Sequence, residues 1–322
     1  MAIIPGVPAP NLAARMSADD LREQGGVTYR VLRSRSLLSK VLSPRMPFTW
    51  SVNPYRGCAM GCRYCYATYT HEFLGITTPE TFHSLVYVKT GAEVETARRL
   101  ARVVKRGERI ALGTATDPYQ PGEAQAGVTR GFLELVAQHR NARLGIVTKG
   151  ALILRDLDLL RRIHQRSRLS VHVSLITPDA SLARQLDPWA PPPDVRIEVM
   201  RRLAEAGIVV WLGLAPVLPA ITDDAASLDT LLGRVAAAGV RRMFTNVLFL
   251  RSPTKEKFLH WLAEAFPAYM EAYTRAYGER TYFRGRYRDV IDARVRALRK
   301  KHGFLDEARD DDFVEPEQIA LF

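Results

Sequence analysis

The stretch Asn53-Pro54-Tyr55-Arg56-Gly57-Cys58-Ala59-Met60-Gly61-Cys62-Arg63-Tyr64-Cys65-Tyr66 holds every cysteine of the 322-residue chain. Its thiols are spaced C-x3-C-x2-C, and small or flexible residues lie between them. One short loop can therefore curl so that three sulfurs converge on one centre, as in a metal-cluster site. A closed structural zinc site needs four protein ligands, usually two cysteine pairs separated by a long gap, and the sequence has no second pair. A three-cysteine site leaves one metal position open.

Two other interpretations of the cysteines are weaker. Free cysteines often pack as small hydrophobic residues, but that role does not require all three to fall between positions 58 and 65. A disulfide framework suits short secreted chains, whereas this chain is long and its cysteine count is odd. The spacing therefore favours a metal cluster.

Cys58, Cys62 and Cys65, with the aromatic Tyr64 directly before the third, resemble the signature of the radical S-adenosylmethionine (SAM) superfamily. The resemblance implies a 4Fe-4S cluster held by three thiolates, with the fourth iron chelated by the amino and carboxylate groups of SAM. A reductant such as flavodoxin or ferredoxin would supply one electron, and SAM would be cleaved to methionine and a 5′-deoxyadenosyl radical that abstracts hydrogen from a substrate. The protein would control ligation, hydrogen bonds to sulfur and burial. Tyr64 would pack against adenine.

Strand and helix patterns alternate after the cysteine loop, which predicts βα units and a parallel sheet. The predicted strands are 48–53, 109–113, 144–148, 169–176, 208–215 and 242–250. The predicted helices are 67–74 (a helix or turn), 96–105, 130–138, 156–164, 196–206, 228–238, 255–277 and 289–301. Six repeats match the partial (βα)6 barrel of the α/β class that is typical of the radical SAM superfamily, and a full eight-stranded barrel is the alternative.

Changes in composition predict four regions. Residues 1–48 carry five prolines and little periodicity, so we expect an extended arm with at most short helices that covers one end of the barrel. The radical SAM (βα)6 core is predicted to span 49–252. A helical accessory region follows at 253–303, and an acidic tail at 304–322.

A polar, turn-forming segment, Gly113–Glu123 (GTATDPYQPGE), follows the second predicted strand, where a ligand would be expected in an α/β fold. Two further segments are Thr148-Lys149-Gly150 and Arg155–Leu160 (RDLDLL). Together with Asn53–Cys58, they resemble the spore-photoproduct-lyase-like branch of radical SAM proteins, whose members are often labelled DNA repair photolyases. The resemblance runs from near residue 53 to near residue 250.

The resemblance also implies residues that bind SAM. Lys149 would neutralise the SAM carboxylate, and Ser174 would hydrogen-bond the same group. The amino group or ribose would be contacted by residues after the second strand, namely Thr114, Thr116 and Asp117. The alternative for Lys149 is a surface lysine in a turn, and for Ser174 an ordinary strand residue. Ala215–Pro219 would flank adenine or form a plain barrel loop.

One departure from the branch concerns the return of hydrogen to the substrate radical. Spore photoproduct lyase uses an additional cysteine near the end of its second strand, and this sequence has no fourth cysteine. A hydroxyl O–H bond, such as that of Thr114, is too strong to replace it readily. The same thymine-dimer repair is therefore not expected here, and Tyr119 is considered as a donor because of its place in the loop.

The charge distribution suggests a polyanionic partner. Seven carboxylates and one arginine give residues 304–322 a net charge of −6, which leaves +18 on the rest of a chain whose formal charge is +12. Such a surface favours nucleic acid, although 38 arginines against 8 lysines can also reflect compositional bias. The connection Gly278–Arg288 interleaves arginines with Tyr282, Phe283 and Tyr287, which suits phosphate contact and base stacking or simply a solvated basic loop. The acidic tail could fold back on this surface.

The remaining expectations concern location and function class. No secretory signal and no membrane-spanning run are found, so a cytoplasmic location without membrane association is expected. Three functions stay open: a radical SAM enzyme acting on a nucleic-acid component, a radical SAM enzyme modifying a peptide, protein or small metabolite, and a non-catalytic iron–sulfur protein that binds nucleic acid or transfers electrons. The open metal position disfavours the third, because simple electron carriers complete four cysteine ligands.

Overall fold

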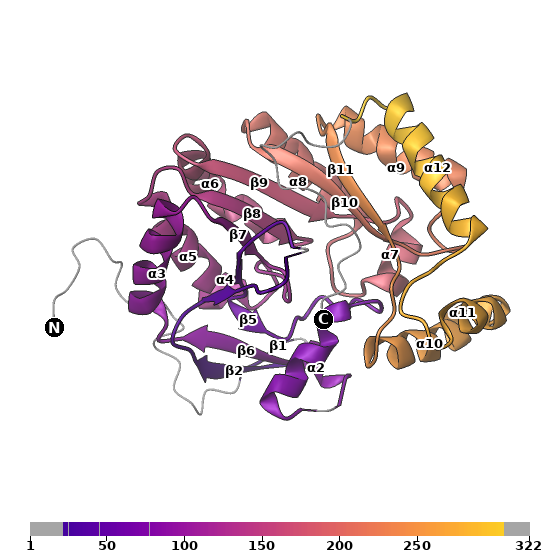
Figure 1. The fold of residues 1–322 in the computed structure, drawn as a ribbon, viewed down its shortest axis with the longest axis horizontal. Coiled ribbons are helices and arrows are strands. Elements are labelled where there is room, and N and C mark those ends of the chain that lie inside the picture. Colours follow the sequence, from indigo (N-terminus) through magenta and orange to yellow (C-terminus); the bar gives the residue numbers. More distant parts are fainter. Residues whose placement is uncertain (1–21, 25, 45, 77, 306–322) are drawn as a thin grey trace.

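The computed structural model describes residues 22–24, 26–44, 46–76 and 78–305. Six parallel strands form its centre (Figure 1). They are β4 (Trp50–Val52), β7 (Arg109–Leu112), β8 (Arg143–Thr148), β9 (Arg168–Ser174), β10 (Val209–Val217) and β11 (Arg242–Val247), adjacent in that order. The short strand β3 (Leu38–Lys40) pairs antiparallel with β4 at one edge. The six-stranded partial barrel is confirmed, and the described residues add no further parallel strand to this sheet.

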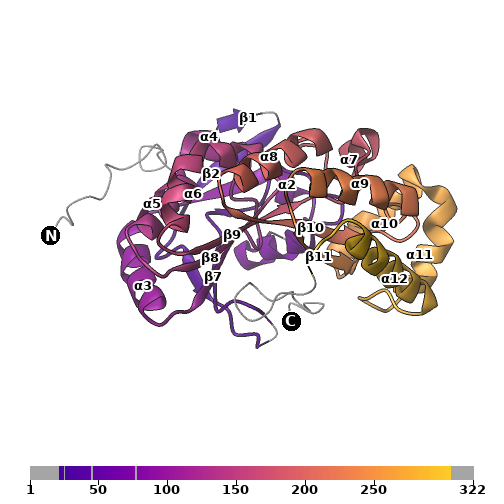
Figure 2. The same ribbon diagram turned by 90° about the horizontal axis from the view of Figure 1, so that it is seen from above.

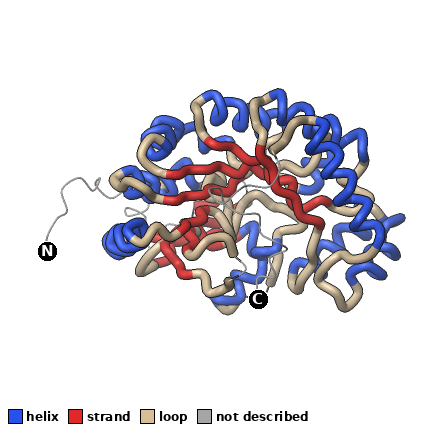
Figure 3. The backbone as a smooth tube through the Cα atoms, turned by 45° about the horizontal axis from the view of Figure 1, so that its top comes forward, coloured by secondary structure: helices blue, strands red, loops and turns tan. Residues whose placement is uncertain are grey.

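Helices lie along the outer side of this sheet, as Figures 2 and 3 show. They are α3 (Glu93–Lys105), α4 (Glu123–Ala126), α5 (Val128–Ala137), η2 (Ala151–Asp156), α6 (Leu157–His164), α7 (Ala180–Leu186), α8 (Pro193–Glu205) and α9 (Ala225–Ala237). Local sequence explains several ends. The Asp179 carboxylate accepts hydrogen bonds from the first amides of α7, and Asp224 caps α9 in the same way. Gly207 follows α8 with φ = +78°, the left-handed conformation that glycine adopts without strain.

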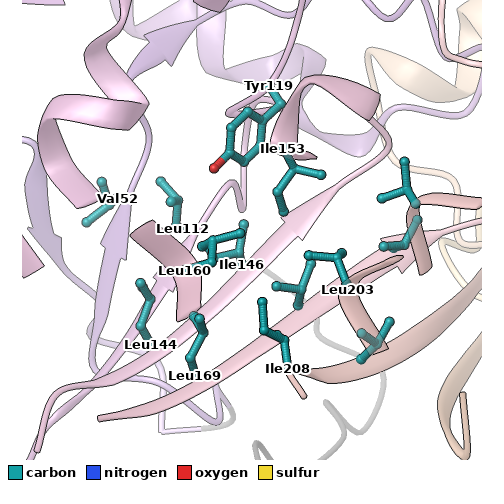
Figure 4. Close-up of a cluster of buried hydrophobic side chains, with 14 of the residues drawn as sticks. Val52, Leu112, Tyr119, Leu144, Ile146, Ile153, Leu160, Leu169, Leu203 and Ile208 are labelled. Atoms are coloured by element: carbon teal, nitrogen blue, oxygen red, sulfur yellow. The ribbon is translucent and has the colours of Figure 1, made fainter. Parts of the chain in front are cut away.

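The core lies between the strands and these helices. Leu144 and Ile146 of β8 pack with Leu160 of α6 and Leu203 of α8 in a cluster of fully buried side chains (Figure 4). Burial of each such side chain contributes about 1.5–3 kcal/mol. The packed core fixes the strand ends, and with them the loops that follow.

A second, four-stranded sheet lies beside the barrel and was not predicted. Its strands are β1 (Arg22–Gln24), β2 (Val27–Arg33), β6 (Leu85–Thr90) and β5 (Tyr55–Arg56), in that order. The segment predicted as an arm with at most short helices therefore contains strands. The sequence of β6, LVYVKT, contains a β-branched and aromatic run that sequence analysis could have used as a strand signal. Because only Gly57 separates β5 from Cys58, this sheet fixes the start of the cysteine loop.

The C-terminal region consists of α10 (Thr254–Ala265), η3 (Pro267–Tyr269), α11 (Met270–Tyr277) and α12 (Arg286–Lys301), so the single helix predicted at 255–277 is interrupted before Pro267. Helix α12 packs against α9. A second apolar cluster joins Phe258 and Tyr277 to Met60 of the loop. Phe304 is buried in the main core, and residues 306–322 of the predicted acidic tail lie outside the described residues. Within the described part of the chain, every helix is too short or too polar to cross a membrane.

Candidate active site

The cysteine loop runs from β5 to the 3-10 helix η1 (Tyr66–Leu74) and is held by close backbone contacts. Gly57 has φ = +89°, and a Cβ at this position would lie 2.6 Å from the carbonyl oxygen of Leu85. The amide of Cys58 donates to the carbonyl of Phe82 at 2.9 Å, and the amide of Ala59 donates to Gln120 Oε1 at 2.9 Å. The loop is thus positioned by the second sheet on one side and by the segment after β7 on the other.

A cavity of about 290 Å³ lies between this loop and the carboxyl ends of the barrel strands. The structure brings every sequence-predicted site residue to its wall: Cys58, Cys62, Tyr64, Cys65, Thr114, Thr116, Asp117, Lys149 and Ser174. Ala215 and Pro216 of β10 also line it, together with Phe244 and Phe249. The predicted site residues therefore share one cavity, and most of the surface that lines it is apolar.

The three thiols of the loop all line this cavity. Burial raises the pKa of Cys58 to about 12, and the neighbouring Asp117 carboxylate adds to this effect, so a bound cation is needed to hold the ligand as thiolate. Two sulfurs accept hydrogen bonds, Cys58 Sγ from the Asp117 amide at 3.4 Å and Cys62 Sγ from Lys149 Nζ at 3.3 Å. Among the described residues, no group of three His, Cys, Asp or Glu side chains is arranged to hold a single metal ion.

Lys149 belongs to a buried charged network that sequence analysis missed. Its Nζ lies 5.3 Å from the centre of the Tyr64 ring and 3.8 Å from Asp187 Oδ1. The Tyr64 hydroxyl donates to Asp187 Oδ1 at 2.7 Å, and Arg196 Nη1 donates to Asp187 Oδ2 at 3.0 Å. Burial alone would raise the pKa of Asp187, but the cations Lys149 and Arg196 hold it below its ordinary value. Asp187 therefore positions two predicted cofactor-binding side chains, Lys149 and Tyr64.

The polar atoms of Asp117 and Thr116 are engaged inside the protein. Asp117 Oδ1 accepts hydrogen bonds from Thr148 Oγ1 at 2.7 Å and from the Tyr119 amide at 2.9 Å, and Oδ2 accepts from the Lys149 amide at 2.7 Å. Thr116 Oγ1 donates to the carbonyl of Gly57 at 2.6 Å. These two residues hold the strand-end loops and the cysteine loop together, and a contact with SAM remains a prediction for both.

Asn53 supports the neighbouring residue Thr114 in a similar way. Its Nδ2 donates to Thr114 Oγ1 at 3.1 Å, and its Oδ1 accepts from the Ala115 amide at 2.8 Å. Asn53 is the first residue of the cysteine stretch, yet no ligand pattern distinguishes it in the sequence. Its role in joining two loops follows only from their positions in the fold.

The suggestion that Tyr119 donates hydrogen is wrong. This side chain is 2 % exposed, does not line the cavity, and packs among buried apolar residues (Figure 4). Burial raises the pKa of Tyr119, and the carboxylates of Asp156 and Glu123 raise it further. The tyrosines that line the cavity are Tyr64 and Tyr66, and the Tyr66 hydroxyl donates to the carbonyl of Thr114.

A row of aromatic rings leads away from the cavity wall. The Tyr66 ring centre lies 5.8 Å from that of Phe249, which lies 6.0 Å from that of Tyr282. The predicted basic and aromatic connection therefore reaches the site through Tyr282. Within η1, Phe73 is 69 % exposed, and the Arg56 guanidinium lies 5.6 Å from its ring centre.

Comparisons with known proteins agree with this geometry. Residues 52–231, more than half of the chain, match the family model "Radical SAM superfamily". An uncharacterized protein of Mycobacterium tuberculosis is 36 % identical over 88 % of this chain and 84 % of its own length, and one of Methanocaldococcus jannaschii is 26 % identical over 78 % and 86 %. Spore photoproduct lyase with bound AdoMet and dinucleoside spore photoproduct shares the fold, with a TM-score of 0.62, 16 % identity and coverage of 93 % of this chain and 84 % of that chain. The chain belongs to the radical SAM superfamily.

Proposed function

We propose that this chain is an enzyme that holds a 4Fe-4S cluster through Cys58, Cys62 and Cys65, binds SAM beside it, and removes a hydrogen atom from a nucleic-acid component. The observation that carries the proposal is the convergence of three thiols and Lys149 on one cavity. When bound, the cluster supplies the electron that cleaves SAM and so generates the 5′-deoxyadenosyl radical. Members of this superfamily are enzymes with this cofactor pair, which supports the assignment.

The chain's own residues would bind SAM and exclude water. The ammonium group of Lys149 is held beside Cys62 Sγ by Asp187, where it would attract the SAM carboxylate. Ser174 lies on the same wall and would hydrogen-bond that carboxylate. Ala215 and Pro216 offer an apolar surface for adenine. Because a dry wall prevents side reactions of a radical, the aromatic lining supports the proposed chemistry.

The surroundings of the cavity support a nucleic-acid substrate. Aromatic side chains provide faces for base stacking, and arginines provide charge for phosphate. Tyr66, Phe249 and Tyr282 form a row of rings that begins at the cavity wall, and the connection Gly278–Arg288, which carries Tyr282, is rich in arginine. The charge of the whole chain is +12. Spore photoproduct lyase, which shares the fold, has been solved with a dinucleoside lesion.

The return of hydrogen to the product would differ from that of a cysteine-dependent lyase. The chain has no cysteine outside the loop, and of its tyrosines near the loop, Tyr66 lines the cavity whereas Tyr119 does not. We therefore assign Tyr66 as the candidate donor in place of Tyr119.

The test is anaerobic reconstitution with iron and sulfide, followed by reduction in the presence of SAM and oligonucleotides deuterated in their sugars or bases. Transfer of deuterium into 5′-deoxyadenosine would support the full proposal. Binding of the oligonucleotide should also weaken steeply with added salt, because phosphate contacts release counterions. Deuterium transfer from a peptide and none from any oligonucleotide would contradict the substrate class, and failure to cleave SAM would contradict the whole proposal.

A further inference from the structure

The outer side of the cysteine loop, away from the cavity, carries an exposed aromatic residue. Trp189 is 54 % exposed, does not line the cavity, and lies against Gly61. A Cβ at Gly61 would lie 2.7 Å from Trp189 Cε3, so the ring fits only because this position is glycine. The Trp189 amide also donates to the carbonyl of Met60 at 3.3 Å. The indole therefore covers the residue that directly precedes Cys62 while remaining open to solvent.

The segment that presents Trp189 is fixed to the loop at several points. The Arg63 amide donates to the carbonyl of Leu186 at 2.9 Å, and Arg63 Nε donates to the carbonyl of Gln185 at 3.4 Å. Arg184 Nη1 donates to the carbonyl of Pro188 at 3.1 Å. These hydrogen bonds hold the end of α7 against the loop, so the backbone that carries Trp189 is fixed in position.

Cations surround this surface. Arg184 is exposed, and Arg63 is partly exposed. A third cation, Lys257, comes from α10, three residues after Thr254, whose Oγ1 donates to the carbonyl of Cys65 at 2.7 Å. Residues three apart share a helix face, so Lys257 lies on the side of α10 that meets the loop. Lys257 is close enough to Arg63 and to the carboxylate of Glu80 for their charges to interact with it.

We propose that Trp189, Arg63, Arg184 and Lys257 form the docking surface for an acidic one-electron carrier protein of the flavodoxin type. This inference rests on the proposed function, since that function requires one electron for each cleavage of SAM. In the transfer, the carrier is oxidised by one electron and the cluster is reduced by one. SAM and substrate occupy the cavity, so the electron must enter from another side. The contact of Trp189 with Gly61 gives a short route to Cys62.

The chemistry of the surface matches this partner. Tryptophan at the centre of a patch and arginine around it are the residues that dominate protein–protein binding energy. Opposite charges steer association and raise its rate, mainly at low salt. A basic rim around a half-exposed tryptophan therefore fits an acidic carrier, and none of its four residues lines the substrate cavity.

The test measures how fast flavodoxin hydroquinone reduces the reconstituted cluster, by stopped-flow absorbance, compared with reduction by dithionite. The combined substitution Arg184→Glu and Lys257→Glu should lower the flavodoxin rate at low salt by about tenfold or more, and the difference should shrink in high salt. Trp189→Ala should lower the flavodoxin rate at both salt concentrations, and Trp189→Phe should restore most of it. Dithionite should reduce every variant at the wild-type rate. The matched control is Arg162→Glu on α6, an exposed arginine on a different helix, which should leave both rates unchanged.

Three results would overturn the docking surface: an unchanged flavodoxin rate in the charge-reversal variant, an equal loss with dithionite, or an equal loss in Arg162→Glu. A shift in oligomeric state of Trp189→Ala with an unchanged flavodoxin rate would also overturn it, by showing that a second copy of the chain binds there. Iron content and dithionite-driven SAM cleavage, measured on the same samples, distinguish a failure of the proposed function from a failure of the docking surface alone. Wild-type protein that fails both contradicts the proposed function as well as the docking surface, whereas wild-type protein that passes both confines the failure to the docking surface.

Discussion

Replacing Asp187 with asparagine should destabilise the protein strongly. The Asp187 and Arg196 side chains are each 1 % exposed, and Arg196 Nη1 lies 3.0 Å from Asp187 Oδ2. Lys149 Nζ lies 3.8 Å from the other oxygen. Asparagine keeps the shape of the side chain but removes its charge, so Asp187→Asn leaves two cations without their shared carboxylate. The substitution therefore tests whether this carboxylate holds the network together.

The expected cost follows from the burial of the pair. Removing one partner of a buried ion pair leaves an uncompensated charge, which costs about 3–5 kcal/mol. The matched control is Asp194→Asn on α8, because Asp194 pairs with Arg234 at 2.6 Å but is 79 % exposed. An exposed pair contributes less than about 1 kcal/mol. The two substitutions are chemically identical and differ in burial.

The assay is urea unfolding of the metal-free protein, followed by tryptophan fluorescence, with iron content after reconstitution as a second readout. Asp187→Asn should lower the free energy of unfolding by several kcal/mol more than Asp194→Asn. It should also reduce iron content, because Asp187 accepts the hydrogen bond of Tyr64 and holds Lys149 beside Cys62. Equal and small losses of stability in the two variants would refute the reasoning.

Three further predictions concern other parts of the fold. Gly57→Ala should reduce iron content several-fold, because a Cβ at this position would lie 2.6 Å from a backbone carbonyl oxygen. Gly127→Ala, also at positive φ but in open space, should leave iron content near that of the wild-type protein. Similar iron content in both variants would contradict the steric argument. Burial lowers the pKa of His172 from 6.5 to about 4, so its contribution to stability is complete above pH 6.5 and is lost as the pH falls toward 4. The urea midpoint of His172→Gln should therefore depend less on pH between 6.5 and 4 than that of the wild-type protein. An unchanged pH dependence would show that His172 is not the cause. Tyr66→Phe should lower product formation with authentic substrate at least tenfold while SAM cleavage continues, and Tyr119→Phe should not; equal effects would remove Tyr66 as the donor.

Much of the site could be predicted from sequence because its residues lie at, or directly after, the ends of strands. The carboxyl ends of parallel strands meet at one edge of a sheet, so assigning strands was enough to bring Lys149 and Ser174 to the cysteine loop. The spacing of the three cysteines was sufficient to predict that their thiols share one site. These parts of the prediction depended on order along the chain and not on side-chain packing.

The parts that sequence analysis missed depend on contacts between distant segments. Strand β2 pairs with β6 across more than fifty residues, and no local pattern specifies such a partner. Asp187 lies in an irregular segment after α7, and its importance arises from Lys149 and Arg196 in other elements. Tyr119 was placed in the correct loop, but the direction of its side chain depends on a turn that the sequence does not fix.

The most direct test of the central claim is the yield of 5′-deoxyadenosine from SAM, measured anaerobically with dithionite-reduced, reconstituted protein. The comparison is between the wild-type chain and Cys62→Ala, with urea unfolding of the metal-free proteins to show that the variant folds. The account predicts that the wild-type protein forms 5′-deoxyadenosine and that the folded Cys62→Ala variant forms none above background. Equal yields from the two proteins, or no product from a wild-type protein that holds four irons per chain as expected for one 4Fe-4S cluster, would contradict it.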